Sequence, residues 1–279
     1  MKERHAEGGP EERGHPRGLR SAAKEGRLRA VSTVHEELAV WRPAEGTLPP
    51  GAWFGLPTRR GGVSRGPYAS LNLGLRVGDE PEAVARNHAI VFRALGVPEP
   101  GPLRVRQVHG TRIVGAEEPA PEADGFLLQA GDPWMAVSVA DCAPVALFAR
   151  DGSCGALLHS GWRGARHGIA PAAVRLLGER GIPPSELVAS IGPCIHACCY
   201  PVGPEVMREF PREALRPHPE GTALDLPGAI ALSLVQAGLE ETAIHAAPEC
   251  TSCARDSFYS HRRDRGVTGR HWALVHLAR

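Results

Sequence analysis

The sequence predicts a mixed α/β fold in a single domain. Its composition, with 42% hydrophobic and 23% charged residues, is ordinary for a globular protein. Short β-like runs come in pairs with only occasional helical stretches between them, which favours a mixed sheet flanked by helices over strict β-α-β alternation. No repeat of fixed period and no second domain boundary interrupts the 279 residues.

The N-terminal segment differs in composition from the rest of the chain. Residues 1–29 carry eight basic and five acidic side chains and almost no large apolar residue, so we expect a flexible tail. Residues 30–279 are predicted to form the single domain, with order beginning at residues 31–41 and a strand at 52–55. Residues 58–68 are predicted to form a turn-rich loop, because they contain several glycines and Pro67.

A helix is predicted at residues 81–95. Pro81 suits the first helical position, Val84 and Val91 recur at helical spacing, and Gly96 ends the helix. Further strands are predicted at residues 103–108, 135–139, 145–148, 156–159, 187–191 and 272–276, and further helices at 171–179, 204–209 and 227–238.

Charge, hydropathy and cysteine content exclude several classes of protein. The 32 basic and 31 acidic residues give a net charge of +1, so we expect neither nucleic-acid nor membrane partners. No apolar run reaches the roughly 18 residues of a membrane helix. Catalysis through a lysine Schiff base is excluded, because the two lysines, Lys2 and Lys24, lie in the predicted tail. Seven cysteines without a signal-like N-terminus predict a reducing, cytoplasmic location.

His109, Cys142 and His159 are the candidate metal ligands. Each lies near the end of a β-like run and close to a glycine or proline, so all three can emerge at sheet edges, where clefts form. A single cysteine or histidine of this kind is often only part of the core. Together, however, a thiolate and two imidazoles are the ligand set of a catalytic zinc with one open position. The sequence therefore predicts a zinc site.

Neighbouring charged and polar residues are candidates for catalysis and substrate binding. Asp141 can orient an imidazole or move protons, the alternative being a turn cap. Arg163 can clamp phosphate through two hydrogen bonds, the alternative being a surface ion pair. In and after the loop at residues 58–68, Arg65 and Asn72 are candidates to reach the phosphate or ribose of a substrate.

Cys250 and Cys253 have the spacing of a metal knuckle. A structural zinc needs two more ligands, and Cys194, Cys198 and His261 are the candidates for completing the set. In the alternative, the two are ordinary thiols. The sequence leaves this second metal site open.

Several motifs in a fixed order resemble the family of laccase-domain proteins, once called multicopper polyphenol oxidoreductases. The similarity runs from about residue 53 to residue 277. The chain differs at Ser160, Pro201 and His261, where the family commonly has alanine, glutamate and an aromatic residue. The motifs are QVHG with His109, ADCAP with Cys142, HSGWRG with His159 and Arg163, IGP with a later Cys-Tyr pair, and FYSHRR with a later TGR.

The resemblance implies a fold, a cofactor and an activity. It implies a single catalytic domain over residues 30–279 with a layered α-β-β-α sandwich, and zinc bound through His109, Cys142 and His159. It also implies a zinc-dependent purine nucleoside phosphorylase that acts on adenosine, inosine or guanosine with phosphate, with adenosine deaminase and methylthioadenosine phosphorylase as side activities. Purine nucleosides and phosphate are then the expected partners.

A mechanism can be written for these residues. Zinc acts as a Lewis acid and lowers the pKa of bound water towards about 7. Arg163 and Arg65 hold phosphate beneath the ribose, and the departing purine takes a proton from Asp141 or from water on the zinc. The sequence does not rank the nucleosides, nor does it fix the proton donor, the oligomeric state or the role of the tail.

Two other activities stay open. A copper-dependent polyphenol oxidase would follow the family's older name, and the trio can bind copper in vitro. Multicopper centres commonly use His-x-His pairs, however, and none of the thirteen histidines lies two positions from another. A metal-free hydrolase would use Cys142 as nucleophile and His159 as base.

Overall fold

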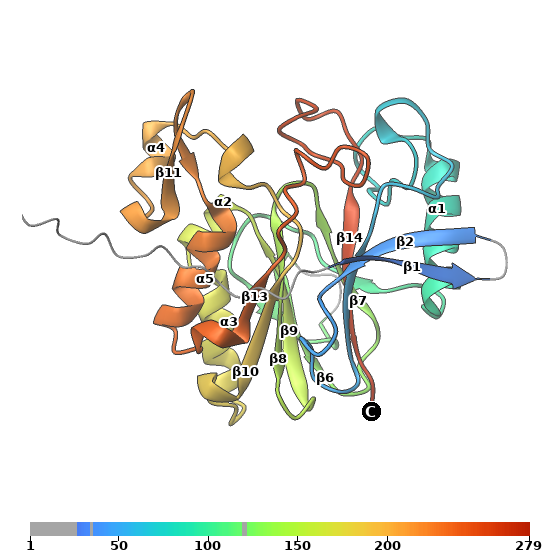
Figure 1. Ribbon diagram of the computed structural model, residues 1–279. Helices are drawn as coiled ribbons and strands as arrows, with labels where there is room; N and C mark the ends of the chain where they lie inside the picture. Colours follow the sequence, from blue (N-terminus) through green and yellow to red (C-terminus); the bar gives the residue numbers. More distant parts are fainter. Residues whose placement is uncertain (1–26, 34–35, 119–121) are drawn as a thin grey trace, which may run out of the picture.

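Two six-stranded sheets lie face to face, and helices cover the outer face of each (Figure 1). The computed structural model describes residues 27–33, 36–118 and 122–279. The strands of the first sheet are, in spatial order, β1 (Arg27–Thr33), β2 (Glu36–Arg42), β3 (Ala52–Pro57), β14 (His271–Leu277), β7 (Met135–Val139) and β4 (Leu103–Arg104). All neighbours in it are antiparallel except β4, which runs parallel to β7.

The second sheet is also mixed. Its two edge strands run parallel to their neighbours, and the inner pairs are antiparallel. In spatial order its strands are β13 (Ile244–Ala246), β10 (Leu187–Ile191), β8 (Ala143–Ala149), β9 (Cys154–Ser160), β6 (Gly125–Gln129) and β5 (Ile113–Val114). A small separate sheet pairs β11 (Leu215–His218) with β12 (Gly221–Leu224).

The helices divide between the two outer faces. They are α1 (Pro81–Leu95), α2 (Trp162–Arg166), α3 (Ile169–Gly178), α4 (Pro204–Met207) and α5 (Leu226–Gln236). Short 3-10 turns lie at Gly66–Tyr68, Pro184–Glu186, Ala197–Cys199, Arg212–Ala214 and Glu241–Ala243. None of the helices in the described part of the chain has the length and apolar character needed to cross a membrane.

Apolar side chains fill the spaces between the four layers. One cluster packs between the two sheets, a second between the first sheet and α1, and a third between the second sheet and α3 and α5. Strand β8 shows the layering best, because Val145 and Leu147 face the helices while Ala146 and Phe148 face the other sheet. A strand covered on both faces consists almost entirely of apolar residues. The arrangement confirms the expected mixed α/β class and α-β-β-α sandwich.

Most predicted elements are present. The helix at 81–95 is α1, the strands at 135–139 and 187–191 are β7 and β10, and the remaining ones overlap observed elements. The strand predicted at 103–108 is wrong beyond residue 104. There the Gln107 side chain takes over the pairing, since its amide donates to the Ser138 carbonyl at 2.9 Å and accepts from the Ser138 N–H at 2.7 Å. Strand β6 and helix α2, which the sequence did not indicate, lie beside the candidate active site described below.

The predicted tail falls largely outside the described residues. Its last three residues, 27–29, belong to β1, which runs antiparallel to β2 with Arg27 opposite Arg42 and Arg29 opposite Val40. The boundary between tail and domain stays a prediction. The predicted loop at 58–68 contains no strand or α-helix and ends in the 3-10 turn Gly66–Tyr68.

The buried His271 should make the free energy of unfolding fall as the pH falls. Its ring is buried, accepts a hydrogen bond from the Tyr259 N–H at 2.8 Å and donates one to the Pro57 carbonyl at 2.9 Å. Burial lowers its pKa from 6.5 to about 3. As pH falls below 6.5 the unfolded chain therefore takes up a proton that the folded chain refuses, down to about pH 3.

We expect His271→Gln to lower the free energy of unfolding at pH 7. Between pH 6.5 and about 3, this free energy should also fall less steeply with pH in the variant than in the wild type, by up to about 1.4 kcal/mol per pH unit. Urea titrations across that pH range measure both effects. His167→Gln, at an exposed histidine, is the control. An unchanged pH slope in His271→Gln would contradict the prediction.

Candidate active site

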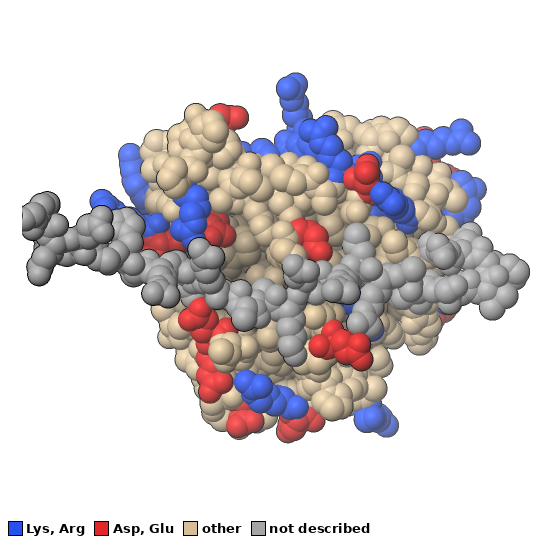
Figure 2. Space-filling model, viewed as in Figure 1, with Lys and Arg blue, Asp and Glu red and all other residues tan. Residues whose placement is uncertain are grey.

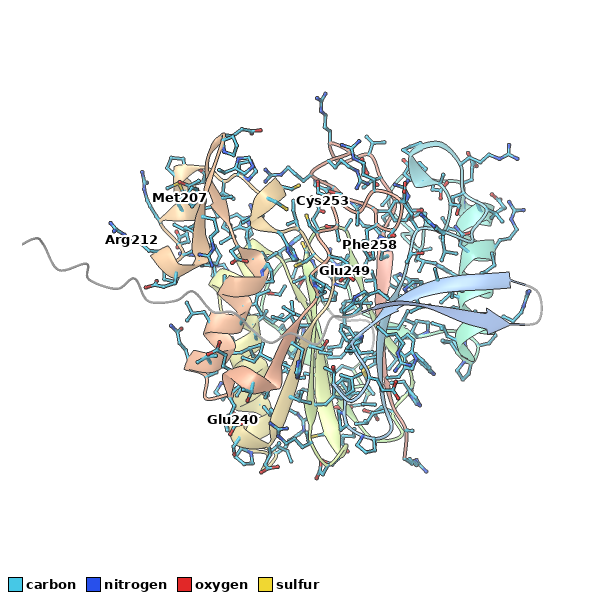
Figure 3. All side chains as sticks on the ribbon, in the orientation of Figure 1. Met207, Arg212, Glu240, Glu249, Cys253 and Phe258 are labelled. Atoms are coloured by element: carbon cyan, nitrogen blue, oxygen red, sulfur yellow. The ribbon has the colours of Figure 1, made fainter. Side chains whose placement is uncertain are left out.

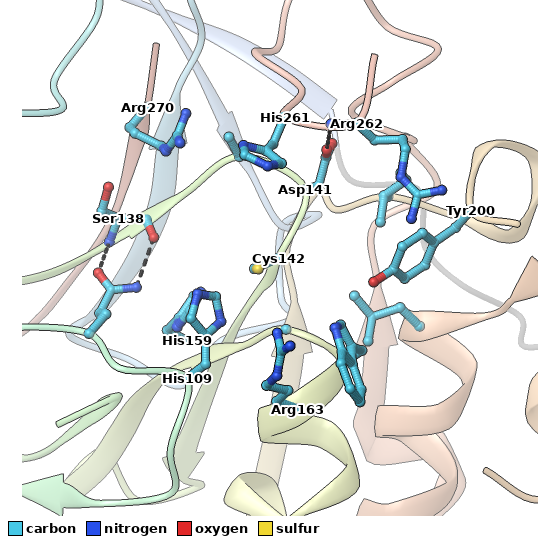
Figure 4. A pocket seen from close by; sticks show the side chains of 16 residues that line it. His109, Ser138, Asp141, Cys142, His159, Arg163, Tyr200, His261, Arg262 and Arg270 are labelled. Carbon is cyan, nitrogen blue, oxygen red and sulfur yellow. Dashed lines mark hydrogen bonds between the residues drawn. The ribbon is translucent and has the colours of Figure 1, made fainter. Parts of the chain in front are cut away.

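The three predicted metal ligands come together where the two sheets meet. His109 lies between β4 and β5, Cys142 lies in the turn from β7 to β8, and His159 lies near the end of β9. One donor atom from each is within 4.8 Å of the others. A pocket of about 500 Å³ opens over them, and in Figure 4 the two imidazoles and the thiol face one another inside it. These residues are a group that can hold a metal ion.

Asp124, which sequence reasoning did not single out, binds the ring of His159 and the backbone of the loop that carries His109. The carboxylate is fully buried and lies 2.8 Å from Nδ1 of His159. It also accepts the backbone N–H groups of Val108, His109 and Gly110 at 3.2, 3.0 and 2.7 Å. Because Nδ1–H of His159 donates to Asp124, Nε2 is the ring atom left for a metal, as in carboxylate–histidine–metal arrangements.

Charge pairing inside the trio favours the thiolate. Burial raises the pKa of Cys142, but the charge of His159 and hydrogen bonds from both imidazoles outweigh it and lower the pKa to about 6. Burial lowers the pKa of His159, yet the Cys142 charge and the hydrogen bond to Asp124 raise it to about 9. Thiolate is the form in which cysteine binds metals and acts as a nucleophile.

The backbone around the trio is unusual in two ways. His109 and Asp141 have positive φ angles of 59° and 84°, which few residues other than glycine adopt. A Cβ atom on Gly161 would lie 2.8 Å from Cys142 Sγ and 3.4 Å from His109 Nδ1. Glycine at 161 therefore leaves open the space between the donor atoms, which is the space that a metal ion would need.

Asp141 lines the pocket, but its carboxylate is used within the protein. Thr251 donates to Oδ1 at 2.6 Å, while Ser260 Oγ and the Arg262 N–H donate to Oδ2 at 3.0 and 2.7 Å. Both oxygens thus accept hydrogen bonds from the 251–262 segment. This geometry suits joining that segment to the β7–β8 turn better than it suits giving a proton to a substrate.

Arginines surround the metal donors. Arg163, Arg262 and Arg270 all line the pocket. Arg163 stacks on Trp162 with its guanidinium carbon 4.4 Å from the ring centre, and Arg262 stacks on Tyr200 at 4.8 Å. In Figure 2, basic side chains gather at the top of the view, over the loops that precede β14, while the rest of this face mixes both signs. The pocket is thus suited to an anion.

Arg65 and Asn72 are not among the residues that line the pocket. The Asn72 side chain is fully buried and uses its polar atoms within the protein: Oδ1 accepts from the Gly74 and Arg270 N–H groups, and Nδ2 donates to Asp79 and the Gly74 carbonyl. By accepting the Arg270 N–H, Asn72 therefore helps to hold the backbone of Arg270 in place. The role of Asn72 in substrate binding stays a prediction.

Several pocket residues were not singled out by sequence reasoning. These are Gln107, Ser138, Tyr200 and Arg270, which reach the pocket from separate elements. Asp124, which was not singled out either, lies behind the metal donors rather than in the lining. Burial raises the pKa of Tyr200 to about 12, so its hydroxyl keeps its proton and can donate a hydrogen bond. For Tyr200 and Arg270, membership of a motif was the only available signal, and for Asp124 there was none.

Comparison with known proteins identifies the family of this chain. A family described as multi-copper polyphenol oxidoreductase laccase matches residues 54–278. The purine nucleoside phosphorylase YlmD of Geobacillus stearothermophilus is 38% identical over 246 residues, which cover 81% of this chain and 90% of the relative. A purine nucleoside phosphorylase of Streptomyces coelicolor is 37% identical over 230 residues, which cover 79% of this chain and 93% of the relative.

A solved structure shares the fold. The crystal structure of YlmD from Geobacillus stearothermophilus superimposes with a TM-score of 0.81 at 33% sequence identity, covering 91% of this chain and all of that one. Because the relatives are named as phosphorylases, the comparison supports the prediction that this protein is an enzyme. With a family match over most of its length and relatives of this similarity, the chain belongs to the multi-copper polyphenol oxidoreductase laccase family.

Proposed function

We propose that this protein is a zinc-dependent purine nucleoside phosphorylase. Its substrates would be phosphate and adenosine, inosine or guanosine, with adenosine deamination and methylthioadenosine phosphorolysis as side activities. The observation that carries the proposal is a single pocket that combines three metal donors with three arginines. Relatives that bear the name purine nucleoside phosphorylase support it.

The donor set fits zinc. One thiolate and two imidazoles are ligands that zinc accepts in catalytic sites, where a fourth position stays open. Asp124 fixes the orientation of His159, and the missing side chain of Gly161 leaves room between the donors. A zinc ion on His109, Cys142 and His159 would supply a Lewis acid next to the substrate.

Phosphate would be held by the arginines of the pocket. In phosphorolysis a phosphate oxygen bonds to C1′ of the ribose while the bond from C1′ to the purine nitrogen breaks, giving free base and ribose 1-phosphate. Arg163, Arg262 and Arg270 can each offer two parallel N–H donors to phosphate. Arg262 and Arg270 take the place that the sequence suggested for Arg65.

Tyr200 is better placed than Asp141 to assist the departing base. Its side chain points into the pocket in Figure 4 and keeps its proton, since its pKa is about 12. A hydrogen bond from this hydroxyl to a purine nitrogen would stabilise the charge that develops there as the bond breaks. Asp141, whose oxygens already accept three hydrogen bonds, would instead hold the pocket wall.

The metal-free hydrolase is the second candidate, because Cys142 and His159 form a thiolate–imidazolium pair. A copper oxidase has less support. The two metal-binding groups found in the described residues contain two histidines in all, whereas a multicopper centre needs many imidazoles. We also propose a cytoplasmic location, where reducing conditions keep the free cysteines reduced.

Product analysis tests the proposed reaction. The purified zinc protein is incubated with adenosine, with and without phosphate, and the products are separated by chromatography. We expect adenine and ribose 1-phosphate only when phosphate is present, and inosine where deamination occurs. Cys142→Ala should lose at least about 100-fold in rate, because the site loses a ligand.

Cys154→Ala, a buried cysteine at the start of β9, is the matched control and should keep its activity. Full activity of Cys142→Ala would overturn the site assignment. Intact nucleosides together with ester cleavage would favour the hydrolase.

Arg163 should act on phosphate rather than on the nucleoside. Loss of a charge-assisted hydrogen bond of about 1.5–3 kcal/mol predicts a roughly 10- to 150-fold higher KM for phosphate in Arg163→Ala. The KM for nucleoside should change little. Steady-state kinetics with each substrate varied in turn measures this, and Arg175→Ala, at an exposed arginine on α3 that pairs with Glu179, is the control. An unchanged KM for phosphate would remove Arg163 from the phosphate site.

Metal affinity should depend on Asp124 and Gly161. We expect Asp124→Asn to weaken zinc binding by about 10- to 100-fold, since the ring of His159 and the backbone N–H of His109 lose their shared carboxylate acceptor. Gly161→Ala should weaken it as well, because the new Cβ enters the space between the donors. Competition with a chromophoric chelator measures the affinities. Gly178→Ala, where an added Cβ meets nothing within 4 Å, is the control, and wild-type affinity in both variants would contradict the site.

A further inference from the structure

Four cysteines from two distant turns meet beside the active pocket. Cys198 and Cys199 lie in the 3-10 turn Ala197–Cys199, and Cys250 and Cys253 flank a turn more than fifty residues later. All four Sγ atoms lie within 4.8 Å of one another. The Sγ atom of Cys253 is 3.6 Å from that of Cys198 and 3.3 Å from that of Cys199. All four are free thiols.

This geometry is that of a tetrahedral thiolate cage. Zinc–sulfur bonds of about 2.3 Å at tetrahedral angles place the sulfurs about 3.8 Å apart. The two distances to Cys253 Sγ, 3.6 and 3.3 Å, are close to this value, the other pairs lie within 4.8 Å, and all four ligands of the group are cysteines. We propose that Cys198, Cys199, Cys250 and Cys253 bind a structural zinc ion, separate from the proposed catalytic one. Of the partners considered from the sequence, Cys198 takes part, while Cys194 and His261 do not.

The backbone arranges these cysteines independently of any metal. Cys194 and Cys250 form a parallel bridge, and the Thr251 N–H donates to the Cys194 carbonyl at 2.9 Å. The His196 N–H points at Cys250 Sγ at 3.5 Å, a kind of hydrogen bond that stabilises a negatively charged sulfur. The Ala254 N–H donates to the Cys250 carbonyl at 2.9 Å and closes the second turn. Both turns are thus fixed with their thiols converging.

Support of the second turn and access from solvent also suit a metal. The Arg263 guanidinium donates to the Thr251 and Ser252 carbonyls at 3.0 and 3.2 Å and pairs with Asp264 at 2.8 Å, so it holds the second turn in place. Cys198 and Cys253 are exposed, which gives a metal a path from solvent. In Figure 3, Cys253 lies in the upper half of the view, below the topmost loops.

The proposed zinc would hold the rim of the active pocket. Cys199 precedes Tyr200, which lines the pocket, and Cys250 precedes Thr251, which donates a hydrogen bond to Asp141. Joining the two turns through one metal therefore fixes two sides of the pocket relative to each other. Structural zinc sites commonly stabilise segments that lack a large core of their own.

Metal analysis in a variant without the catalytic site tests the proposal. Cys142→Ala, purified under reducing conditions from zinc-supplemented cells, should retain about one zinc per chain by mass spectrometry of the metals, where wild type holds roughly two. Adding Cys198→Ser and Cys253→Ser should remove it. Replacement of the remaining zinc by cobalt should give the strong thiolate-to-cobalt charge-transfer band of tetrahedral thiolate coordination.

Cys142→Ala with Cys154→Ser is the matched control and should keep both the metal and the cobalt spectrum. Three outcomes would overturn the proposal: no metal in Cys142→Ala, retention of the metal after both serine substitutions, or a disulfide within the cluster under reducing conditions. The cobalt spectrum of Cys142→Ala decides the matter even where the serine variants fail to fold. Because the zinc content is measured without nucleosides, failure here is distinct from failure of the proposed phosphorylase activity.

Discussion

The buried carboxylate of Asp124 is the interaction on which the arrangement of the site depends. A carboxylate without partners in such a place costs on the order of several kcal/mol, and here it is stabilised by three consecutive backbone N–H groups and the ring of His159. These donors belong to the loop of His109 and to strand β9. Satisfying one buried charge therefore brings the two imidazoles together, with their rings 4.9 Å apart between centres. It also fixes which nitrogen of His159 faces a metal.

The two-sheet sandwich supplies the remaining ligand and the opening. Strands β7 and β8 are consecutive in the chain but belong to different sheets, so the turn that carries Cys142 lies at the seam between them. The segment after β13 then crosses the top of the sandwich, where Asp141 accepts its hydrogen bonds. It brings Arg262 and Arg270 to the pocket. The cysteine cluster lies where this segment meets the turn before Tyr200.

The chemistry of the pocket is at variance with the family's name. An oxidase of the multicopper type needs several imidazoles around several copper ions. The pocket has three imidazoles, of which only His109 and His159 belong to the metal-binding group, together with one thiol and three arginines. Arginine contributes nothing to electron transfer, but its planar, permanently charged group is well matched to phosphate. The residues around the donors are thus the reason for proposing transfer to phosphate rather than oxidation.

The sequence by itself determined the fold class, helix α1, strands such as β7 and β10, and the candidate donors His109, Cys142 and His159, because local periodicity and ligand type can be read from neighbouring residues. Only the tertiary structure decided the partners of these residues. Asp124 lies 35 positions from His159, and Asn72 lies 198 positions from the Arg270 N–H that it binds. No pattern in the chain indicates contacts over such distances. The cysteine cluster is a further example: the sequence suggested Cys194 as a partner, but the structure brings Cys199 to it, because the turn of Cys199 folds onto residues 250–253.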